Sequence, residues 1–232
     1  MAAKSPNPRK LLVKRRQIRR IHKLLLKEYG EIRPWKKSPL DTLVAVILSQ
    51  NTNDKNSFAA FKILKGKLPN WEKLLNTPTT QIAKLIKVGG LANIKAKRIK
   101  EVLKAIMEKE GKLSLKRLEG MAPEDARNYL MQFKGIGPKS AAVIVAFAFG
   151  KPSFPIDTHI FRVLKRIPLI PERTSYIKAH EIMEFAVPNE LKIPLHTAII
   201  THGRMICRAR MPLCSGCILT GECKRVGISA SA

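Results

Sequence analysis

Acidic side chains are scarce in this chain of 232 residues, which has 17 Asp and Glu against 44 Lys and Arg. The formal net charge is therefore +27, and so large an excess of one sign destabilises a compact chain by self-repulsion unless an anionic partner is bound. Nucleic acid is the favoured partner, with an anionic membrane surface as the alternative. The membrane alternative is weak, because no apolar run approaches the roughly 20 residues needed to cross a bilayer.

Two further absences concern the compartment. The N-terminal segment MAAKSPNPRK is polar and basic, and it lacks the continuous apolar stretch of a secretion signal. Cysteine is absent from most of the chain, because all four cysteines lie between residues 207 and 223. We therefore expect an intracellular, cytoplasmic protein, in which clustered cysteines hold metal more often than they form disulfides.

Alternating strand patterns are also nearly absent, whereas apolar residues recur at helical spacing along most of the chain. Residues 11–30, LLVKRRQIRRIHKLLLKEYG, show this spacing with Lys and Arg between the apolar positions. Residues 38–50, SPLDTLVAVILSQ, begin with a capping cluster and continue as a nearly unbroken apolar stretch, which indicates a buried helix. The sequence predicts an all-α fold class.

The four cysteines are spaced C-x6-C-x2-C-x5-C, at Cys207, Cys214, Cys217 and Cys223. Four thiolates suit either a structural zinc ion or a [4Fe–4S] cluster. Structural zinc sites usually pair two C-x2-C knuckles, and this chain has one. Spacing alone leaves both groups possible.

A second informative stretch is ARNYLMQFKGIGPKSAAVIVAFAFG, residues 126–150. It predicts a helix that ends at residues 133–134, a tight turn at Gly135, Ile136 and Gly137, and a new helix opened by proline. The glycines permit unusual backbone torsions and expose N–H groups at a helix start, where an anion such as DNA phosphate can bind. Taken alone, such a turn is weak evidence, since it is common in plain helical bundles.

Together these stretches, with IDTHIFRV and LHTAIITHGRMIC further on, make the chain resemble the endonuclease III family of helix-hairpin-helix DNA glycosylases. The resemblance covers roughly residues 38–224. It implies that the four cysteines bind a [4Fe–4S] cluster, and that Arg208 and Arg210 in their loop face DNA. It also implies a six-helix barrel domain at residues 32–151 and a cluster domain built from residues 1–31 and 152–232.

Two residues within this region are candidates for catalysis. Lys139 puts a cation in the first turn of a helix, against the helix dipole, and its plainer interpretation is an exposed lysine touching phosphate. The resemblance implies instead that its amine attacks a sugar carbon. Asp157 is an excellent helix N-cap by residue type. Because it follows Lys139 by 18 positions, as in the family, the resemblance implies that it stabilises positive charge developing on the deoxyribose.

Two more segments resemble the parts of the family that probe DNA. In VAVILSQNTND, a glutamine of the family fills the gap left by an everted base, and either Gln50 or Asn51 matches it. In GGLANIKAKRIK, Leu91 matches a residue that wedges into the base stack; its plainer interpretation is a core leucine at a helix start. Such residues are physically needed because everting a base costs a few kcal/mol.

The resemblance therefore implies a monomeric, nucleoid-associated enzyme. It acts on double-stranded DNA with damaged bases or abasic sites, removes oxidised pyrimidines and nicks the strand by β-elimination. A monofunctional glycosylase for mismatched thymine or uracil is one alternative, although such relatives carry Tyr at the position of Lys139. An adenine-mismatch glycosylase needs an acidic residue near Ala45, where none is found. A non-catalytic DNA-binding module with a structural cluster is the third alternative.

Overall fold

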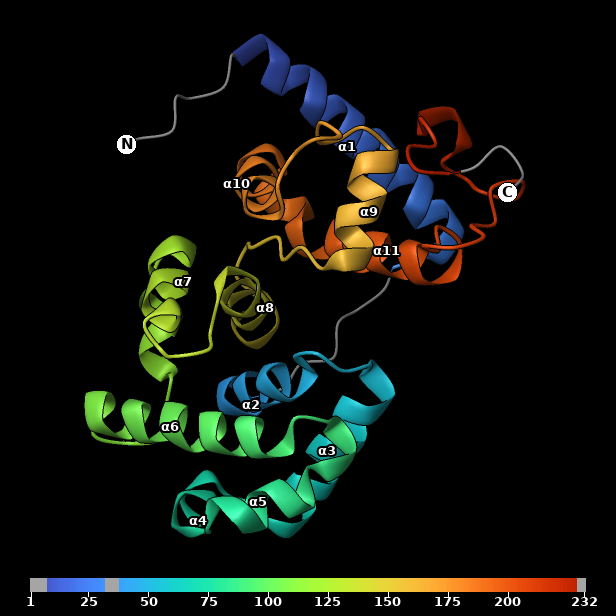
Figure 1. The fold of residues 1–232 in the computed structure, drawn as a ribbon. Helices are drawn as coiled ribbons and strands as arrows, with labels where there is room; N and C mark the ends of the chain where they lie inside the picture. The colour runs from blue at the N-terminus through green and yellow to red at the C-terminus, as the bar shows by residue number, and fades with distance from the viewer. Residues whose placement is uncertain (1–7, 32–37, 229–232) are drawn as a thin grey trace. The chain divides into compact units, whose positions relative to one another are not determined.

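The structure, a computed structural model, describes residues 8–31 and 38–228. These residues form helices joined by turns and loops, with no strand among them (Figure 1), which confirms the all-α fold class. The chain divides into two compact units, one spanning residues 35–151 and the other combining residues 1–34 with 152–232. Within the described residues, no helix is both long and apolar enough to cross a bilayer.

We call residues 38–151 the hairpin unit, because they include the glycine turn. Seven α-helices are described in it, together with two short 3₁₀ turns. They are α2 (Pro39–Ser49), α3 (Asp54–Lys67), α4 (Trp71–Asn76), α5 (Thr79–Leu85), η1 (Lys87–Gly89), α6 (Ala92–Glu110), η2 (Lys116–Gly120), α7 (Pro123–Met131) and α8 (Pro138–Phe149).

A proline explains the division between α4 and α5. Pro78 disfavours helical torsions at the residue before it, and Thr77 is accordingly extended, with φ −83° and ψ 137°. The chain therefore leaves α4 after six residues and begins α5 at once. The barrel architecture itself remains a prediction.

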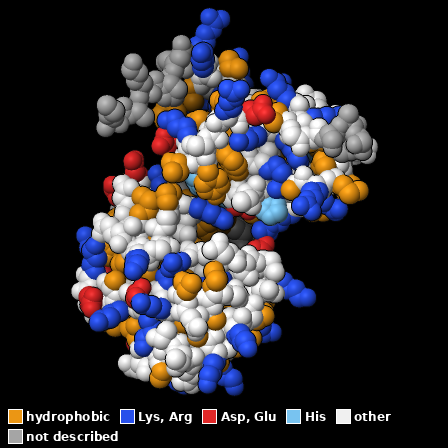
Figure 2. Space-filling view, in the orientation of Figure 1, with side chains coloured by type: hydrophobic (Ala, Val, Ile, Leu, Met, Phe, Trp, Pro, Cys, Tyr) orange, Lys and Arg blue, Asp and Glu red, His pale blue; other side chains and the backbone are white. Residues whose placement is uncertain are grey.

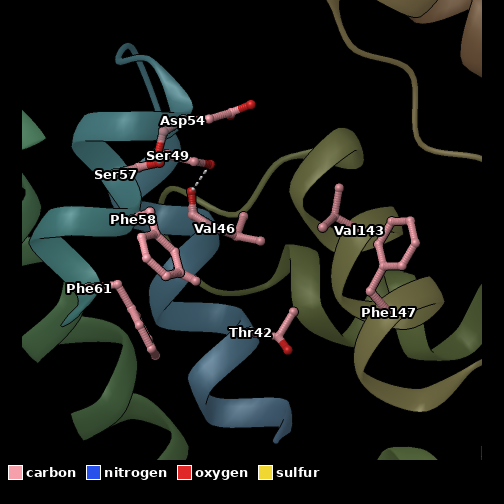
Figure 3. A pocket seen from close by; sticks show the side chains of 10 residues that line it. Thr42, Val46, Ser49, Asp54, Ser57, Phe58, Phe61, Val143 and Phe147 are labelled. Atoms are coloured by element: carbon pink, nitrogen blue, oxygen red, sulfur yellow. Dashed lines mark hydrogen bonds between the residues drawn. The ribbon is translucent and has the colours of Figure 1, made fainter. Parts of the chain in front are cut away.

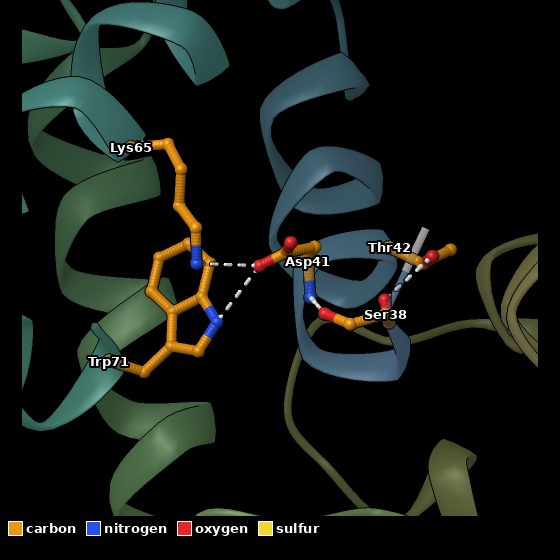
Figure 4. A network of polar contacts seen from close by, with 5 residues as sticks. All are labelled: Ser38, Asp41, Thr42, Lys65 and Trp71. Carbon is orange, nitrogen blue, oxygen red and sulfur yellow. Dashed lines mark hydrogen bonds and ion pairs between the residues drawn. The ribbon is translucent and has the colours of Figure 1, made fainter. Parts of the chain in front are cut away.

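The start of α2 shows how local sequence and packing act together (Figure 4). The Ser38 hydroxyl accepts the N–H of Asp41 at 3.2 Å, which caps the helix as its sequence predicts. The Asp41 carboxylate also accepts from Lys65 Nζ at 2.9 Å and from Trp71 Nε1 at 3.1 Å. One acidic side chain in the first turn of α2 thereby ties this helix to α3 and α4.

We call residues 8–31 and 152–228 the cysteine-loop unit. Its helices are α1 (Pro8–Tyr29), α9 (Thr158–Arg166), α10 (Tyr176–Ala186), η3 (Asn189–Leu191), α11 (Lys192–Met205) and η4 (Thr220–Glu222). Helix α1 packs on α10 and α11 and buries Ile18, Ile21 and Leu25 completely, at the spacing that one helix face requires. After α11, residues 206–228 follow as a loop with one 3₁₀ turn.

Candidate functional site

The hairpin connecting α7 and α8 occupies residues 132–137. Helix α7 ends at Met131, two residues before the predicted end. The N–H groups of Gln132 and Phe133 donate to carbonyls three residues earlier, so the last turn tightens and the α-helical pattern stops.

Two buried side chains anchor the turn. Phe133 is 5% exposed and Ile136 is 3% exposed, and the Ile136 N–H closes the turn by donating to Phe133 O at 3.0 Å. Gly137 is the N-cap of α8 and offers no side chain to cap it, so the first N–H groups of α8 lack partners within the helix. The hairpin therefore presents N–H donors and the positive end of a helix dipole, which together suit an anion.

Gly135 meets two requirements that another residue would fail. Its φ is +88°, in the region that favours glycine, and an added Cβ would lie 2.4 Å from Arg98 Cδ and Nε. Arg98 Nη1 donates to Gln50 Oε1 at 2.6 Å, and Gln50 Nε2 donates to Gly135 O at 3.0 Å. A continuous chain of hydrogen bonds thus runs from α6, through the end of α2, to the hairpin.

The first candidate catalytic residue, Lys139, is exposed in the first turn of α8. It lines a cavity of about 410 Å³ together with both hairpin glycines and the end of α2. The lining residues are Val46, Ser49, Gln50, Asn51, Gly135, Gly137, Lys139, Ser140 and Val143. The structure therefore gathers Lys139, Gln50 and Asn51, which the sequence only predicts separately, around one space.

A second cavity of about 290 Å³ lies beside the first, between α2, α3 and α8 (Figure 3). Val46, Ser49 and Val143 line both cavities. The walls of the second are mainly apolar, and Val143 and Phe147 of α8 stand across from α2. Ala45, the position at which an adenine-mismatch glycosylase needs an acid, also lines it.

Three hydroxyl groups in this second cavity have their protons engaged. Thr42, Ser49 and Ser57 each donate to a backbone carbonyl three or four residues earlier, at 2.8 to 3.0 Å. A hydroxyl that donates its only proton keeps acceptor lone pairs. The polar groups of the wall therefore favour a ligand that donates hydrogen bonds.

The structure distinguishes the two candidates for gap filling. Gln50 is half-buried, and its amide is engaged at both ends by the bonds to Arg98 and Gly135. Asn51 is exposed, has a left-handed backbone with φ +52°, and makes no side-chain hydrogen bond within the described part of the chain. Of these two side chains, Asn51 is the one that can move without first breaking a hydrogen bond in the described part of the protein.

Leu91 is also placed for contact outside the protein. It is the N-cap of α6, has φ +48°, and leaves half of its side chain exposed. The plainer interpretation of Leu91 as a core residue is therefore wrong. A leucine in the left-handed region is strained by about 1–2 kcal/mol, and such strain concentrates at functional sites.

The second candidate catalytic residue, Asp157, belongs to the cysteine-loop unit. It is 8% exposed and caps α9, because its Oδ1 accepts the Ile160 N–H at 2.7 Å. Tyr176 donates to Ile156 O, and His196 Nδ1 lies 2.8 Å from Pro155 O, so side chains hold the backbone on the N-terminal side of Asp157. The pKa of Tyr176 is raised to about 12, by burial and then by the negative charge of Asp157.

The four cysteines of the loop are all free thiols. Cys207 is buried and the other three are half-buried. The pKa of the Cys217 thiol is raised, first by burial and further by negative charge at Cys207, Cys223 and Cys214. No group of three or more His, Cys, Asp or Glu within residues 8–31 and 38–228 is already arranged to hold a metal ion.

Nitrogen donors nevertheless surround these sulfurs. Arg166 Nη1 lies 3.3 Å from Cys207 Sγ, the Arg225 N–H donates to Cys223 Sγ at 3.3 Å, and His202 Nε2 lies 3.6 Å from Cys217 Sγ. Such donors stabilise thiolates, and hydrogen bonds to sulfur are typical around iron–sulfur clusters. The donor set therefore fits a group that is bound by thiolates.

One buried arginine holds much of this loop. Arg166 is 4% exposed, and it donates to Arg208 O at 2.7 Å and to Val226 O at 3.4 Å, besides reaching Cys207. Its own carbonyl accepts the Lys224 N–H at 2.7 Å. Residues far apart in the loop are thereby fastened to the end of α9.

The basic residues predicted to face DNA lie on the surface of the loop. Arg208 and Arg210 are both exposed, and Arg208 donates to Met205 O at 3.1 Å. Lys and Arg side chains also spread over both units in the view of Figure 2, where acidic side chains are few. On this face the positive charge is therefore not confined to the cysteine loop.

Sequence reasoning missed two basic residues with structural roles, namely Arg98, which holds Gln50, and Arg166, which holds the cysteine loop. Each is one of 44 Lys and Arg residues, so residue type alone carries no signal. Gly135 offered an indirect clue, because a glycine at a tight turn often allows a neighbouring group to approach closely.

Comparison with known proteins identifies the family of the chain. Residues 44–188 match the HhH-GPD family, described as a superfamily of base excision DNA repair proteins. The chain belongs to this superfamily. The resemblance to endonuclease III-like helix-hairpin-helix glycosylases, stated from the sequence, is confirmed.

Individual relatives give the extent of the similarity. The chain is 36% identical over 181 residues to a putative DNA glycosylase of Arabidopsis thaliana, covering 78% of this chain and 59% of that protein. It is 35% identical over 187 residues to endonuclease III of Haemophilus influenzae, covering 81% and 84% of the two chains. A trapped endonuclease III–DNA covalent intermediate superposes with a TM-score of 0.79 at 28% identity, covering 90% and 95%.

Proposed function

We propose that this chain is a bifunctional DNA glycosylase and abasic-site lyase that removes oxidised pyrimidines from duplex DNA. The observation that carries the proposal is the position of Lys139, an exposed amine that lines one cavity with the hairpin glycines and Asn51. The covalent protein–DNA intermediate trapped with a relative supports this assignment.

Lys139 is the proposed nucleophile. Its Nζ lone pair forms a bond to C1′ of the deoxyribose while the C1′–base bond breaks, and the base leaves with that electron pair and takes up a proton. The attached nitrogen loses one proton, the C1′–O4′ bond opens and O4′ takes up a proton, which gives a protonated Schiff base. Removal of a C2′ proton then expels the 3′ phosphate by β-elimination, and hydrolysis of the imine frees the enzyme.

Asp157 is the proposed electrostatic partner. Its carboxylate stabilises the positive charge that grows on the sugar as the base departs. Its capping bond to Ile160 does not conflict with this role, because that bond uses one carboxylate oxygen and leaves the other available.

DNA is proposed to bind at the hairpin and to be probed by two side chains. The N–H groups at the start of α8 hold a phosphate, Asn51 fills the gap left by the everted base, and Leu91 wedges into the stack. Arg208 and Arg210 add phosphate contacts. Gln50 is assigned to holding the hairpin, since both ends of its amide are engaged.

Cys207, Cys214, Cys217 and Cys223 are proposed to hold a [4Fe–4S] cluster, which supplies cross-linking of the loop by four metal–thiolate bonds. Purified protein is expected to contain about four irons and four inorganic sulfides per chain. Stoichiometric zinc without sulfide would assign the site to zinc.

Borohydride trapping tests the proposed reaction, because reduction converts the Schiff base into a stable amine. Wild-type protein should form a covalent adduct with DNA containing an oxidised pyrimidine, and Lys139→Gln should abolish both trapping and nicking while DNA binding remains. Lys134→Gln is the matched control, since it removes an exposed lysine from the same hairpin. A trapped adduct with Lys139→Gln would refute the assignment of the nucleophile.

A further inference from the structure

The two segments proposed to probe DNA share one unusual contact. We call residues 48–53 the first probing segment and residues 89–92 the second. Lys95 Nζ donates to Leu48 O in the first and to Gly89 O in the second, both at 2.7 Å. The side chain that joins them is 1% exposed.

Both carbonyls held by Lys95 lie at helix ends. Leu48 O belongs to the last turn of α2, and Gly89 O belongs to the last residue of η1. Carbonyls at a helix C-terminus lack partners within the helix and carry its negative dipole. One ammonium group therefore satisfies both and draws the two helix ends toward a common point.

Each of these carbonyls is followed within three residues by a residue other than glycine that has a left-handed backbone. Asn51 comes three positions after Leu48 and has φ +52°, and Leu91 comes two positions after Gly89 and has φ +48°. Left-handed torsions at residues other than glycine persist only where the surroundings enforce them. The bonds from Lys95 fix the backbone three residues before Asn51 and two residues before Leu91.

Packing alone does not account for a lysine at this position. Lys95 has no carboxylate partner in the described part of the chain, and desolvation by burial lowers its pKa. Lys192, also buried, offers a contrast, since its Nζ bonds to the Glu184 carboxylate at 2.7 Å. A methionine of similar length would fill the space around Lys95 without the cost of burying a charge.

We propose that Lys95 is a positioning residue that locks the two probing segments into one rigid unit, so that Asn51 and Leu91 enter the duplex together. This inference rests on the proposed glycosylase function. Base eversion requires the gap to be filled and the stack to be opened at a fixed separation, and that separation is set within the protein by Lys95.

Hydrogen exchange tests the mechanical part of the proposal without requiring activity. Lys95→Met should accelerate amide exchange by about tenfold or more in residues 49–53 and 89–92, because local opening then needs no buried bond to break. Lys100→Met is the matched control: Lys100 lies on the same helix and donates to Thr77 O at 2.8 Å, away from both probing segments. Unchanged exchange in either probing segment of Lys95→Met would overturn the proposal.

Kinetics tests the functional part. In single turnovers, Lys95→Met should slow base release from a paired lesion by about 10- to 100-fold. Small misplacements of the groups that position a substrate have effects of this size. Cleavage of a preformed abasic site, which needs less unstacking, should fall by less than about threefold. Lys100→Met should not lower the rate of base release more than the rate of abasic-site cleavage. Equal losses on the two substrates would reduce Lys95 to a stability role and refute the proposal.

A double-mutant cycle shows whether Lys95 acts through Leu91. If it does, Leu91→Ala combined with Lys95→Met should be little worse on the paired lesion than Leu91→Ala alone. Independent, multiplicative losses would contradict the coupling. Should Lys95→Met fail to fold, Lys95→Gln, which keeps an uncharged donor, should show the same selective loss to a smaller degree.

The two proposals fail in different ways. A wild-type protein that releases no base from a panel of lesions defeats the glycosylase assignment, while the exchange experiment still decides whether Lys95 holds both segments. An active wild type with unchanged substrate selectivity in Lys95→Met defeats only the positioning role.

Discussion

The hairpin unit and the cysteine-loop unit both bury a cation against backbone carbonyls, but the carbonyls differ in kind. Lys95 bonds to the ends of two helices that are already formed. Arg166 bonds to carbonyls of a loop that has little regular structure between residues 206 and 228. The first cation joins the ends of formed elements, whereas the second joins separate points of an irregular loop to the end of α9.

The contrast follows from the number and kind of groups that each cation satisfies. Lys95 donates to two carbonyls at helix ends, whereas Arg166 donates to three loop carbonyls and to Cys207 Sγ. Each buried group left unpaired costs about 1–3 kcal/mol. We therefore expect removal of Arg166 to cost more stability than removal of Lys95, and only removal of Lys95 to alter selectivity.

Replacement of Arg166 should give the largest effect on stability. Arg166→Met leaves several carbonyls and Cys207 Sγ without their donor, and should destabilise the cysteine-loop unit by about 3–5 kcal/mol. Denaturant unfolding, monitored segment by segment by hydrogen exchange, measures this loss of stability. Lys165→Met is the control, since it removes the neighbouring cation, which lies 4.4 Å from the Phe161 ring, at a cost of only about 0.5–1 kcal/mol. Equal effects of the two variants would contradict the role of Arg166.

Asp157→Asn should separate charge from capping in the same unit. Asparagine caps a helix about as well as aspartate, so the melting temperature should hardly change. Base release should fall by about 100-fold, because the negative charge beside the developing cation is lost. Nicking of a preformed abasic site should fall less, since no glycosidic bond remains to break. A lower melting temperature with normal base release would leave Asp157 as a cap alone.

Gly135→Ala tests the contact between Arg98 and the hairpin in the hairpin unit. The new Cβ displaces Arg98 from Gln50, and alanine must adopt a left-handed backbone at this position. The free energy of unfolding of the unit, measured by heat or denaturant, should therefore fall by about 1–2 kcal/mol. Gly66→Ala is the control, because Gly66 lies in α3 with nothing near its Cβ position and should gain stability. If Arg98→Ala fully rescues Gly135→Ala, the loss comes from the clash and not from the torsion.

The smallest expected effect is spectroscopic and reports on both units. Tyr29 and Tyr176 in one unit and Tyr129 in the other have pKa values raised to about 12, in each case chiefly by burial. They are all the tyrosines of the chain. Since the unfolded value is about 10, their contribution to stability is complete below pH 10 and is lost as the pH rises through 12. Ultraviolet absorbance of tyrosinate near pH 10.5 in native protein would contradict this.

Local sequence determined much of what the structure contains. Apolar spacing predicted the all-α class, and Ser38 and Asp157 are the N-caps that their residue types indicate. The glycines of the hairpin and the spacing of the cysteines pointed to one family of glycosylases. These features are readable because helix periodicity, capping and turn torsions depend on residues that are neighbours in the chain.

Tertiary structure alone decided which residues hold the site together. The bond from Gln50 to Gly135 spans 85 positions and that from Lys95 to Leu48 spans 47, so no local pattern could reveal either. The first of these contacts also distinguished Gln50, whose amide is engaged, from Asn51. In a chain with 44 basic residues, the role of each cation depends on the carbonyl or thiol that folding brings to it, because the residue type is the same at every position.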